Sequence, residues 1–465
     1  MPIESADKAV FEYSVPVIVI GAGACGLSAA LAAAGEGASV LVLERDDAPT
    51  GSTSLSAGLI PGAGTSFQAE KNVEDDVETF FEDIMKKAKG KTDPVMARRV
   101  AEQSGPTVEW LAASGVQMHL VTDFLLPGHS RHRLHGPPNQ TGVELETALV
   151  NAVNAAGVDI ITSATAETLY ADDAGRIVAV AFRRPDGTLE TVGCDAVILA
   201  CNGFGGNPEL VGEYIPEMRT AGFFGHVGNK GDAIVWGRAL GAGIADMNAY
   251  QGHASVAEPH GVLLTWAVIT EGGFQVNVEG KRFSNELKGY SEQAVEVVGQ
   301  PGGIAWNIYD ERSEKPAFAF QDYRDLLENG AVRTAASVEE LAAATGLPAD
   351  ALARTIAEVE AFADGKAQDP LGRDFTTHPK LAPPYKAARV TGGLFHTQGG
   401  LVIDTDARVL RADGSPLPNL FAGGGAARGI SGPSSWYLAG NGLVTAVVFG
   451  RLAGLAAAGL AGAAA

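Results

Sequence analysis

The sequence contains few of the residues that disulfide-stapled or metal-stapled proteins depend on. Only three cysteines, Cys25, Cys194 and Cys201, occur among 465 residues, and none of them forms a C-x-x-C pair. This spacing favours neither a disulfide framework nor a zinc site. We therefore interpret the cysteines as small core residues and predict no metal centre.

Basic residues are also scarce. The chain has 34 Lys and Arg against 55 Asp and Glu, a formal net charge of −21. Because such a surface repels phosphate backbones, we exclude nucleic acid as a partner.

Long uninterrupted apolar runs are missing as well. The first 14 residues carry acids and no apolar core of a secretory signal, and the apolar tail after Val444 is interrupted by Arg451 and by glycines. Since a bilayer requires about 20 apolar residues in a row, we predict a cytoplasmic protein without a membrane partner.

Glycine is what the chain has in excess. It accounts for 59 of the 465 residues, against an average share of roughly 7%. The length fits two domains, and 46% hydrophobic with 19% charged residues describes an ordered globular protein. Because the glycines cluster beside apolar runs, we expect the backbone to approach a bound ligand closely at several points.

The clearest local pattern is a strand, a glycine turn, a helix and a second strand near the N-terminus. The apolar run 15–20 leads into Gly21-Ala-Gly23-Ala-Cys-Gly26, and a small-residue helix (27–34) and a strand (40–43) follow. In G-x-G-x-x-G, the three glycines permit the tight turn, the approach of a pyrophosphate and close packing of helix on strand. Glu44 ends the second strand, where a carboxylate can accept both ribose hydroxyls. We predict a dinucleotide site.

The rest of the chain indicates two regions of different texture. Residues 159–164, 177–183 and 191–199 read as a β-meander followed by a further strand. From about 248 to 397 the glycine-rich texture stops. We therefore predict an α/β fold in which a dinucleotide-binding domain, residues 1–247 and 398–465, is interrupted by a second domain, residues 248–397.

The second region contains its own local signals. Residues 276–283 resemble a hairpin, and Ser337 with Glu340 forms the sequence pattern of a capping box at the start of a helix. Residues 349–362 have helical apolar spacing, and 379–385 form a proline-rich connector.

Further small-residue segments suit a long dinucleotide that the backbone contacts at many points: 50–58, 200–206 and 423–425. With the motifs N-V-E-G-K-R-F-S-N-E (277–286) and F-H-T-Q-G-G (395–400), and the segments 419–424 and 439–441, the chain resembles the flavoprotein subunit of the fumarate reductase and succinate dehydrogenase superfamily. The resemblance spans about residues 15–454.

This resemblance implies a Rossmann-like FAD-binding domain with an inserted α+β capping domain that holds the substrate. The 52–54 stretch stands where covalently flavinylated members carry a histidine, so noncovalent FAD is expected. The resemblance and the glycine motif together give these cofactor-binding candidates: Gly21, Gly23, Ala24, Gly26, Glu44, Arg45, Ser52, Thr53, Ser54, Ala57, Gly58, Ala166, Ala200, Asn202, Gly203, Asp232, Gly424, Gly440, Asn441 and Leu443.

The chain departs from fumarate reductases at the positions that handle a dicarboxylate. Where the resemblance places three arginines and a glutamate, this sequence has Tyr290, Ile269, Tyr437 and Trp266. A tyrosine pair cannot replace guanidinium groups that bind carboxylates bidentately. Two family histidines, His253 and His396, remain, and their alternative interpretation is a structural role.

Both tyrosines are similar to those of the 3-ketosteroid dehydrogenases, whose N-E-x-x-x-Y matches Asn285 to Tyr290 without a gap. That similarity implies that Tyr290 is the proton-abstracting base, while Tyr437 binds the ketone oxygen. The match is incomplete, because Phe124 lies where an assisting tyrosine is expected, the loop 434–440 has different glycine spacing, and His396 has no steroid-enzyme counterpart. A smaller cyclic ketone or ketoacid is therefore expected.

Three hypotheses follow. The first is an FAD-dependent dehydrogenase that desaturates the bond next to a carbonyl, with Tyr290 as base and Tyr437 and His396 on the carbonyl side. The second is an ene-reductase on an unsaturated acid, anchored by His253 and His396. The third is a flavin subunit that only passes electrons to a partner, although this chain shows no heme or iron–sulfur motif. The external electron donor or acceptor is left open.

Several single residues have two interpretations. The aromatic residues 124, 266, 395 and 436 either line an apolar pocket or belong to the core, and Tyr290 is either the catalytic base or a surface residue.

Overall fold

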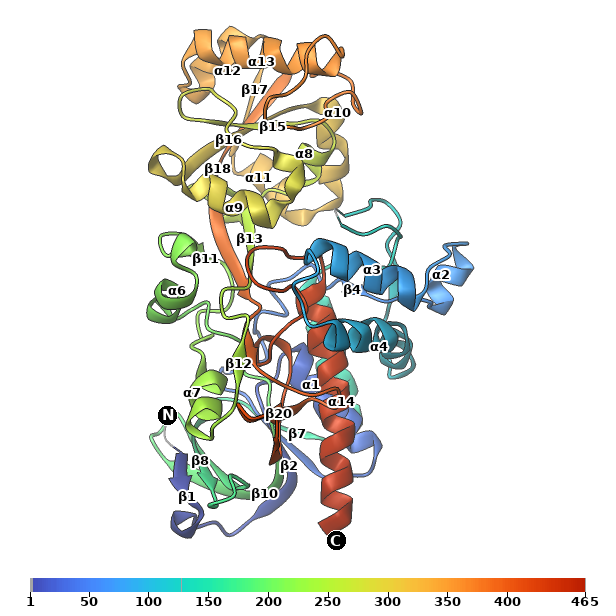
Figure 1. Cartoon of the computed structure of the whole chain (residues 1–465), viewed down its shortest axis with the longest axis vertical. Coiled ribbons are helices and arrows are strands. Elements are labelled where there is room, and N and C mark those ends of the chain that lie inside the picture. The colour runs from blue at the N-terminus through green and yellow to red at the C-terminus, as the bar shows by residue number, and fades with distance from the viewer. Residues whose placement is uncertain (1–2, 127, 465) are drawn as a thin grey trace. The chain divides into compact units, whose positions relative to one another are not determined.

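The computed structural model describes residues 3–126 and 128–464 (Figure 1). They form two compact units. The first contains Met1–Ile215, Gly225–Tyr250 and His396–Ala465, and the second contains Pro216–Phe224 and Gln251–Phe395. The segment 216–224 belongs to the second unit because β11 (Gly222–Phe223) pairs in parallel with β18 (Tyr385–Thr397). Sequence reasoning had no local signal for that pairing.

The first unit is built on a nine-stranded mixed sheet. The strand β10 is its organising element, because its first half pairs antiparallel with β9 and its second half lies between the parallel strands β2 and β21. From one edge the order is β1 (Ile3–Ser5), β8 (Thr165–Ala171), β9 (Ile177–Arg183), β10 (Leu189–Leu199), β2 (Ser14–Ile20), β3 (Val40–Leu43) and β7 (Asp159–Ile161), with β21 (Pro416–Ala422) joined to β10 and to β20 (Arg408–Leu410).

Two small sheets and eight α-helices complete this unit as far as the structure describes it. The small sheets join β4 (Ile60–Pro61), β6 (Leu134–Gly136) and β5 (His119–Leu120), and β12 (Ile244–Ala245) with β19 (Gly400–Leu401). The helices are α1 (Ala24–Gly35), α2 (Ser66–Glu70), α3 (Val77–Lys87), α4 (Pro94–Ala113), α5 (Gly142–Ala155), α6 (Pro208–Tyr214), α7 (Asp232–Ala239) and α14 (Asn441–Ala464).

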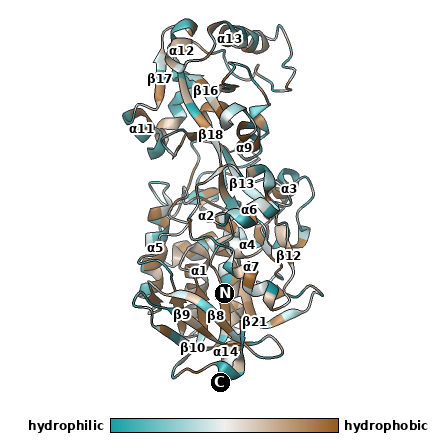
Figure 2. Ribbon diagram, turned by 90° about the vertical axis from the view of Figure 1, so that its left-hand side faces the viewer, coloured by the Kyte–Doolittle hydropathy of each residue, from teal (hydrophilic) through white to brown (hydrophobic). Residues whose placement is uncertain are grey.

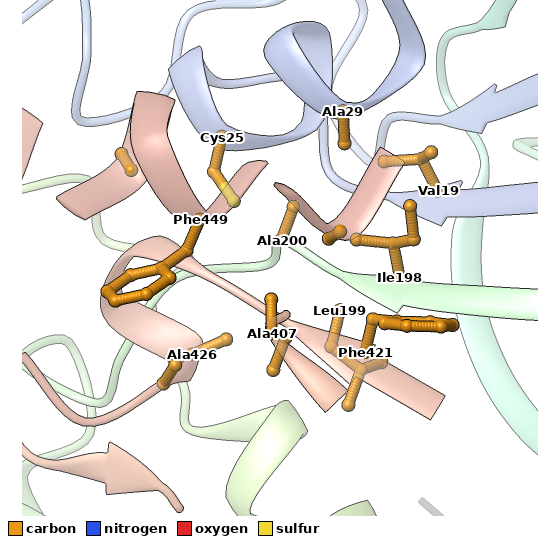
Figure 3. Packing of buried hydrophobic residues seen from close by; sticks show 14 of the residues in the cluster. Val19, Cys25, Ala29, Ile198, Leu199, Ala200, Ala407, Phe421, Ala426 and Phe449 are labelled. Carbon is orange, nitrogen blue, oxygen red and sulfur yellow. The ribbon is translucent and has the colours of Figure 1, made fainter. Parts of the chain in front are cut away.

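The helices α1 and α14 pack closely because both present small residues to each other. A Cβ at Gly450 would overlap the carbonyl of Cys25, and one at Gly454 would overlap that of Ala29. Figure 3 shows Cys25 and Phe449 in this contact layer, above residues of β10 and β21. The hydropathy colouring of Figure 2 is correspondingly brown around α1, β8 and β10. The core of the first unit therefore lies between its sheet and these two helices.

The helix α14 is longer and more apolar than the sequence analysis allowed. Residues 441–462 have the length and composition of a membrane-crossing helix, but over half of their most apolar window is buried inside the protein. The buried face packs on α1, so its apolar composition has a structural cause.

The second unit is built on a seven-stranded sheet with β18 at its centre. Its path is β14 (Val262–Leu263), β13 (Tyr250–Ala257), β18, β16 (Ile304–Asp310) and β15 (Phe274–Asn277), and both β11 and β17 (Val332–Ala335) also pair with β18. Its helices are α8 (Ala267–Thr270), α9 (Tyr290–Val298), α10 (Glu311–Glu314), α11 (Gln321–Glu328), α12 (Val338–Thr345) and α13 (Ala349–Ala363).

The local sequence patterns of this unit predicted its turns and helix ends only in part. The hairpin-like turn predicted over 276–283 is present, since the Asn277 amide donates to the Lys281 carbonyl, but it joins no strand pair, because β15 pairs with β16. Ser337 caps α12, but Glu340 accepts from the amide of Ala336, so the reciprocal half of the capping box is displaced by one residue. The start of α13 agrees with the prediction, and its end lies one residue later.

Candidate active site

The G-x-G-x-x-G turn has the geometry that each glycine was expected to provide. Gly21 has φ +106°, and a Cβ there would lie 2.6 Å from the oxygen of Ala200. A Cβ at Gly26 would overlap the carbonyl of Gly21, so helix and strand are in contact. At Gly23, by contrast, a Cβ would meet only Thr53 Oγ1, at 3.3 Å. The backbone is therefore open at the position where a pyrophosphate approaches.

Glu44 and Thr53 bind the backbone around this turn. Glu44 is buried and accepts from the amides of Ala22, at 2.8 Å, and Asp46, at 3.0 Å. The amide of Ala24, in the first turn of α1, donates to Thr53 Oγ1 at 2.9 Å. The 52–54 segment thus lies at the N-terminus of α1, where amides and the helix dipole favour a phosphate.

The remaining cofactor candidates also lie in the first unit. Asn202, with φ +65°, accepts from the amide of Gly203, and Gly425 packs against its side chain. Arg45 donates to the carbonyl of Gly228, and the side chain of Asn229 donates to Ser52. Other candidates lie on regular elements or in the loops beside them: Ala57, Gly58, Ala166 on β8, Ala200 after β10, Asp232 at the start of α7, and Gly424, Gly440 and Leu443 near α14.

Two buried polar groups near these segments have unsatisfied atoms. Asn441 Oδ1 at the first residue of α14 has no hydrogen-bond partner, and neither oxygen of Glu146 on α5 has one. Burial raises the pKa of Glu146 to about 7, with the Ser54 hydroxyl and the Glu44 carboxylate as its polar neighbours. An open backbone at Gly23 and a free acceptor at Asn441 fit a bound dinucleotide.

In the first unit, His396 and Tyr437 meet around the N-terminus of α14. Tyr437 Oη accepts from the amide of Gly442 at 3.0 Å, so its hydroxyl hydrogen is left to donate elsewhere. His396 Nδ1 lies 2.6 Å from Gln398 Nε2. A Cβ on Gly442 would lie within 3.9 Å of Tyr437 Oη, Gln398 Nε2 and His396 Cε1, which places the three side chains around one point.

Burial keeps both groups neutral. It lowers the pKa of His396 to about 4 and raises the pKa of Tyr437 to about 12, the latter against the opposing effect of the Gly442 and Gly440 amides. At neutral pH this cluster therefore offers N–H and O–H donors and no positive charge.

In the second unit, His253 and Tyr290 form a stacked pair. Their ring centroids are 4.8 Å apart at an interplanar angle of 22°. His253 also meets the edge of Trp266 at 5.9 Å and the ring of Phe395 at 5.6 Å. Tyr290 is half-buried at the first residue of α9, after a buried Gly289 with φ +136°. The structure thus groups these residues, two of which sequence reasoning left as core or pocket.

Burial lowers the pKa of His253 to about 3, so this ring is neutral too. Its Nδ1 accepts from the amide of Ser255 at 3.2 Å, which leaves the ring hydrogen on Nε2. Trp266 and Ile269 are buried on and before α8, and the indole Nε1 of Trp266 has no hydrogen-bond partner.

The motif over 277–286 has a structural function that sequence reasoning missed. Glu286 is buried and accepts from Arg282 at 2.9 Å and Arg373 at 3.1 Å, while Arg282 also pairs with Asp369 at 3.0 Å. Burial alone would raise the pKa of Glu286, but the two arginines hold it below its usual value. We call Arg282, Glu286, Asp369 and Arg373 the ion cluster; it anchors the segment that leads into Tyr290.

The other two aromatic residues considered for a pocket lie in the first unit. Phe124 packs on the small cluster of Leu59, Val121 and Leu134, and Lys89 Nζ lies 4.3 Å above the ring of Trp436. The three cysteines are free; Cys25 is a core residue as predicted, whereas Cys194 and Cys201 are partly buried against the core, and burial raises the pKa of each thiol to about 12. Within the described ranges, no group of three or more His, Cys, Asp or Glu residues could hold a metal ion.

Comparison with known proteins connects this geometry to a family. Residues 16–443 match the family described as "FAD binding domain". A probable fumarate reductase of Shewanella frigidimarina is 31% identical over 458 residues, 97% of this chain and 76% of the relative, and a urocanate reductase of Eggerthella lenta is 29% identical over 96% and 75%.

Solved structures agree. The open conformation of a flavocytochrome c3 fumarate reductase superposes with a TM-score of 0.83 at 30% identity, over 98% of this chain and 80% of that one. The 3-ketosteroid-Δ4-(5α)-dehydrogenase of Rhodococcus jostii reaches 0.79 at 25% identity, over 98% and 100%. The expected fold class, an FAD-binding α/β fold of this type, is confirmed. The chain belongs to the FAD binding domain family and is an FAD-dependent oxidoreductase of the fumarate reductase and ketosteroid dehydrogenase type, acting on carbon–carbon double bonds.

Proposed function

We propose that this enzyme desaturates the carbon–carbon bond next to the carbonyl of a small cyclic ketone or ketoacid. The observation that carries the proposal is that the candidate positions carry no cationic side chain. Tyr437 and His396 are neutral donors, and Tyr290 and Trp266 stand where the family resemblance places charged residues. Neutral donors suit a carbonyl oxygen, whereas a dicarboxylate calls for guanidinium groups.

The residues divide the chemistry as follows. Tyr437 has its acceptor position filled by the Gly442 amide, so its O–H is directed to the carbonyl oxygen of the substrate. Stabilising negative charge on that oxygen acidifies the neighbouring C–H, and Tyr290 as phenolate takes that proton. The oxidising power for the reaction would come from bound FAD, as the acceptor for the hydride and its two electrons from the adjacent carbon. The product has the new double bond.

His253 supports the base in this scheme. Its neutral ring stacks on the ring of Tyr290 and so fixes the position of that ring. Apolar surface from Trp266 and Phe395 borders the same pair, which suits a cyclic hydrocarbon frame.

The test is the change Tyr290→Phe, with Tyr385→Phe as the matched control in the same unit. Anaerobic mixing of wild type with a panel of saturated cyclic ketones should bleach the flavin absorbance. Tyr290→Phe should slow that bleaching by roughly 10²- to 10⁴-fold while FAD content and thermal stability stay near wild type. Wild-type kinetics in Tyr290→Phe would contradict the assigned base.

A second candidate is favoured by the relatives. The similar proteins include enzymes named fumarate, urocanate and vinyl phenol reductase, so the reverse direction on an unsaturated acid is the competing function. His253 and His396 would then bind the carboxylate as neutral donors. If unsaturated acids reoxidise the reduced enzyme and no ketone bleaches the oxidised one, this second function replaces the first.

A further inference from the structure

A chain of four side chains leads from the first residue of α14 to His396. Asn441 Nδ2 donates to Ser431 Oγ at 3.4 Å, Ser431 Oγ donates to Gln398 Oε1 at 3.1 Å, and Gln398 Nε2 lies 2.6 Å from His396 Nδ1. We call Asn441, Ser431, Gln398 and His396 the relay. The first three are 1–3% exposed, so water does not compete for these bonds.

With the amide atoms of Asn441 and Gln398 where the structure places them, the relay runs in one direction. Ser431 has one hydroxyl hydrogen, and because its oxygen already accepts from Asn441, that hydrogen goes to Gln398 Oε1. The amide of Gln398 is thereby oriented with its NH₂ group toward His396. An N–H donor facing Nδ1 requires a lone pair there, so the single hydrogen of the neutral ring lies on Nε2.

Gln398 is held in place independently of the histidine. Its backbone N–H donates to the carbonyl of Ala249, and its carbonyl accepts from the amide of Gly429, both at 2.8 Å. A Cβ at Gly429 would lie 2.8 Å from Gln398 Oε1, so the glycine leaves room for the amide. The backbone of Gln398 is therefore fixed on both sides, and its amide is closely packed against Gly429.

Burial is the cause of the neutral state of His396. The low pKa of its ring arises from burial, without a contribution from a charged group in the described part of the chain. The titratable group that shares its surroundings is Tyr437, whose Oη and the His396 Cε1 both lie against Gly442, and Tyr437 is neutral. The hydrogen bond to Gln398 is thus the interaction that selects the tautomer.

We propose that Gln398 is a positioning residue that holds His396 as the Nε2–H tautomer, so that the histidine donates a hydrogen bond to the carbonyl oxygen of the substrate. The hydrogen bond to the substrate rests on the proposed function, whereas the tautomer rests only on the hydrogen bonds of the relay. It adds a second donor to Tyr437 on the carbonyl side. It also explains why a glutamine, which has both a donor and an acceptor, stands between Ser431 and His396.

Nitrogen-15 NMR of the FAD-loaded enzyme with labelled histidine tests the tautomer directly, with the His396 signal assigned by its loss in His396→Asn. Wild type should show Nε2 protonated and Nδ1 bare. Gln398→Met keeps the length of the side chain and removes the donor, so the signal should move toward a mixture. Gln398→Glu places an acceptor opposite Nδ1, so it should show Nδ1 protonated and a raised pKa of His396. Gln68→Met, at a glutamine that is 1% exposed in the same unit, should leave the His396 signal unchanged.

Rapid-mixing kinetics with the most reactive ketone then test the role. Gln398→Met should slow flavin bleaching by roughly 10- to 100-fold, as expected for a lost orienting hydrogen bond, with FAD content unchanged. A protonated Nδ1 in wild type, or a signal unmoved in Gln398→Met, overturns the assignment. A changed tautomer with wild-type bleaching rates overturns the positioning role. If no ketone reacts with wild type while the NMR pattern is as expected, the proposed function fails and the tautomer assignment stands.

Discussion

The two compact units bury polar side chains beside their candidate site residues in opposite ways. In the first unit, the relay consists of neutral groups that each satisfy the next one. In the second, the ion cluster holds four charged side chains that are 1–5% exposed. Neutral hydrogen bonds select orientation and tautomer at modest energetic cost, whereas a buried ion cluster tolerates no missing member. A neutral relay therefore suits a site that orients a substrate, and a buried ion cluster suits a scaffold.

The largest expected effect comes from breaking the ion cluster. Arg373→Met leaves the buried carboxylate of Glu286 with one arginine fewer and should lower the free energy of unfolding by about 3–5 kcal/mol. Arg389→Met, at a pair with Glu258 whose arginine is 46% exposed, is the control and should cost about 0–1 kcal/mol. Denaturant unfolding of the FAD-loaded variants measures both. Equal effects would remove the distinction between scaffold and surface pairs.

On acidification, the relay and the ion cluster should lose their contributions to stability at different pH values. The folded-state pKa of His396 is about 4, below its ordinary value of 6.5, so the unfolded chain binds the proton first and stability falls as pH drops from 6.5 toward 4. The pKa of Glu286 is below 4.5, so its contribution is lost only below that pH. Between pH 6.5 and 4.5, the free energy of unfolding should therefore decrease by about 1–3 kcal/mol less in His396→Asn than in wild type. Urea unfolding at several pH values measures this difference. A variant that follows the wild-type curve from pH 6.5 to 4.5 would contradict this order.

Glu146 is a third case, a buried carboxyl that pairs with no cation in the described part of the chain and has Ser54 as its polar neighbour. Its folded-state pKa of about 7 lies above the ordinary 4.5, so stability is lost as pH rises through this window. Glu146→Gln removes the ionisation and should raise the free energy of unfolding by about 1–2 kcal/mol at pH 8, with little change at pH 5. Thermal melts at the two pH values measure it, and a variant less stable at pH 8 would show that the carboxylate has a favourable partner.

The smallest effect is expected within the relay. Ser431→Ala removes one neutral donor and should lower the free energy of unfolding by about 1 kcal/mol. Its stability can be compared with Arg373→Met in the same denaturant series. A loss as large as that of the ion cluster would show that the relay is also scaffold.

Short-range features were predictable from the sequence because neighbouring residues determine them. The strand at 40–43, the strand at 177–183 and the glycine turn between β2 and α1 have the predicted positions. The hairpin at 276–283 failed for the reverse reason. Its turn is real, but the partner strand, β16, lies some 30 residues further along the chain, where no local pattern announces the pairing.

Residue types, by themselves, predicted a dinucleotide site at Gly21, Gly23 and Gly26, and they put no cationic side chain at 266, 290 or 437. Only the tertiary structure decided which of these side chains contact residues from distant parts of the chain. Tyr290 stacks on His253 from 37 positions earlier, and Gln398 receives its orientation from Ser431, 33 positions later. The functional group of a residue is known from the sequence. Its pKa, tautomer and orientation depend on burial and on partners from distant segments, which only the folded chain brings together.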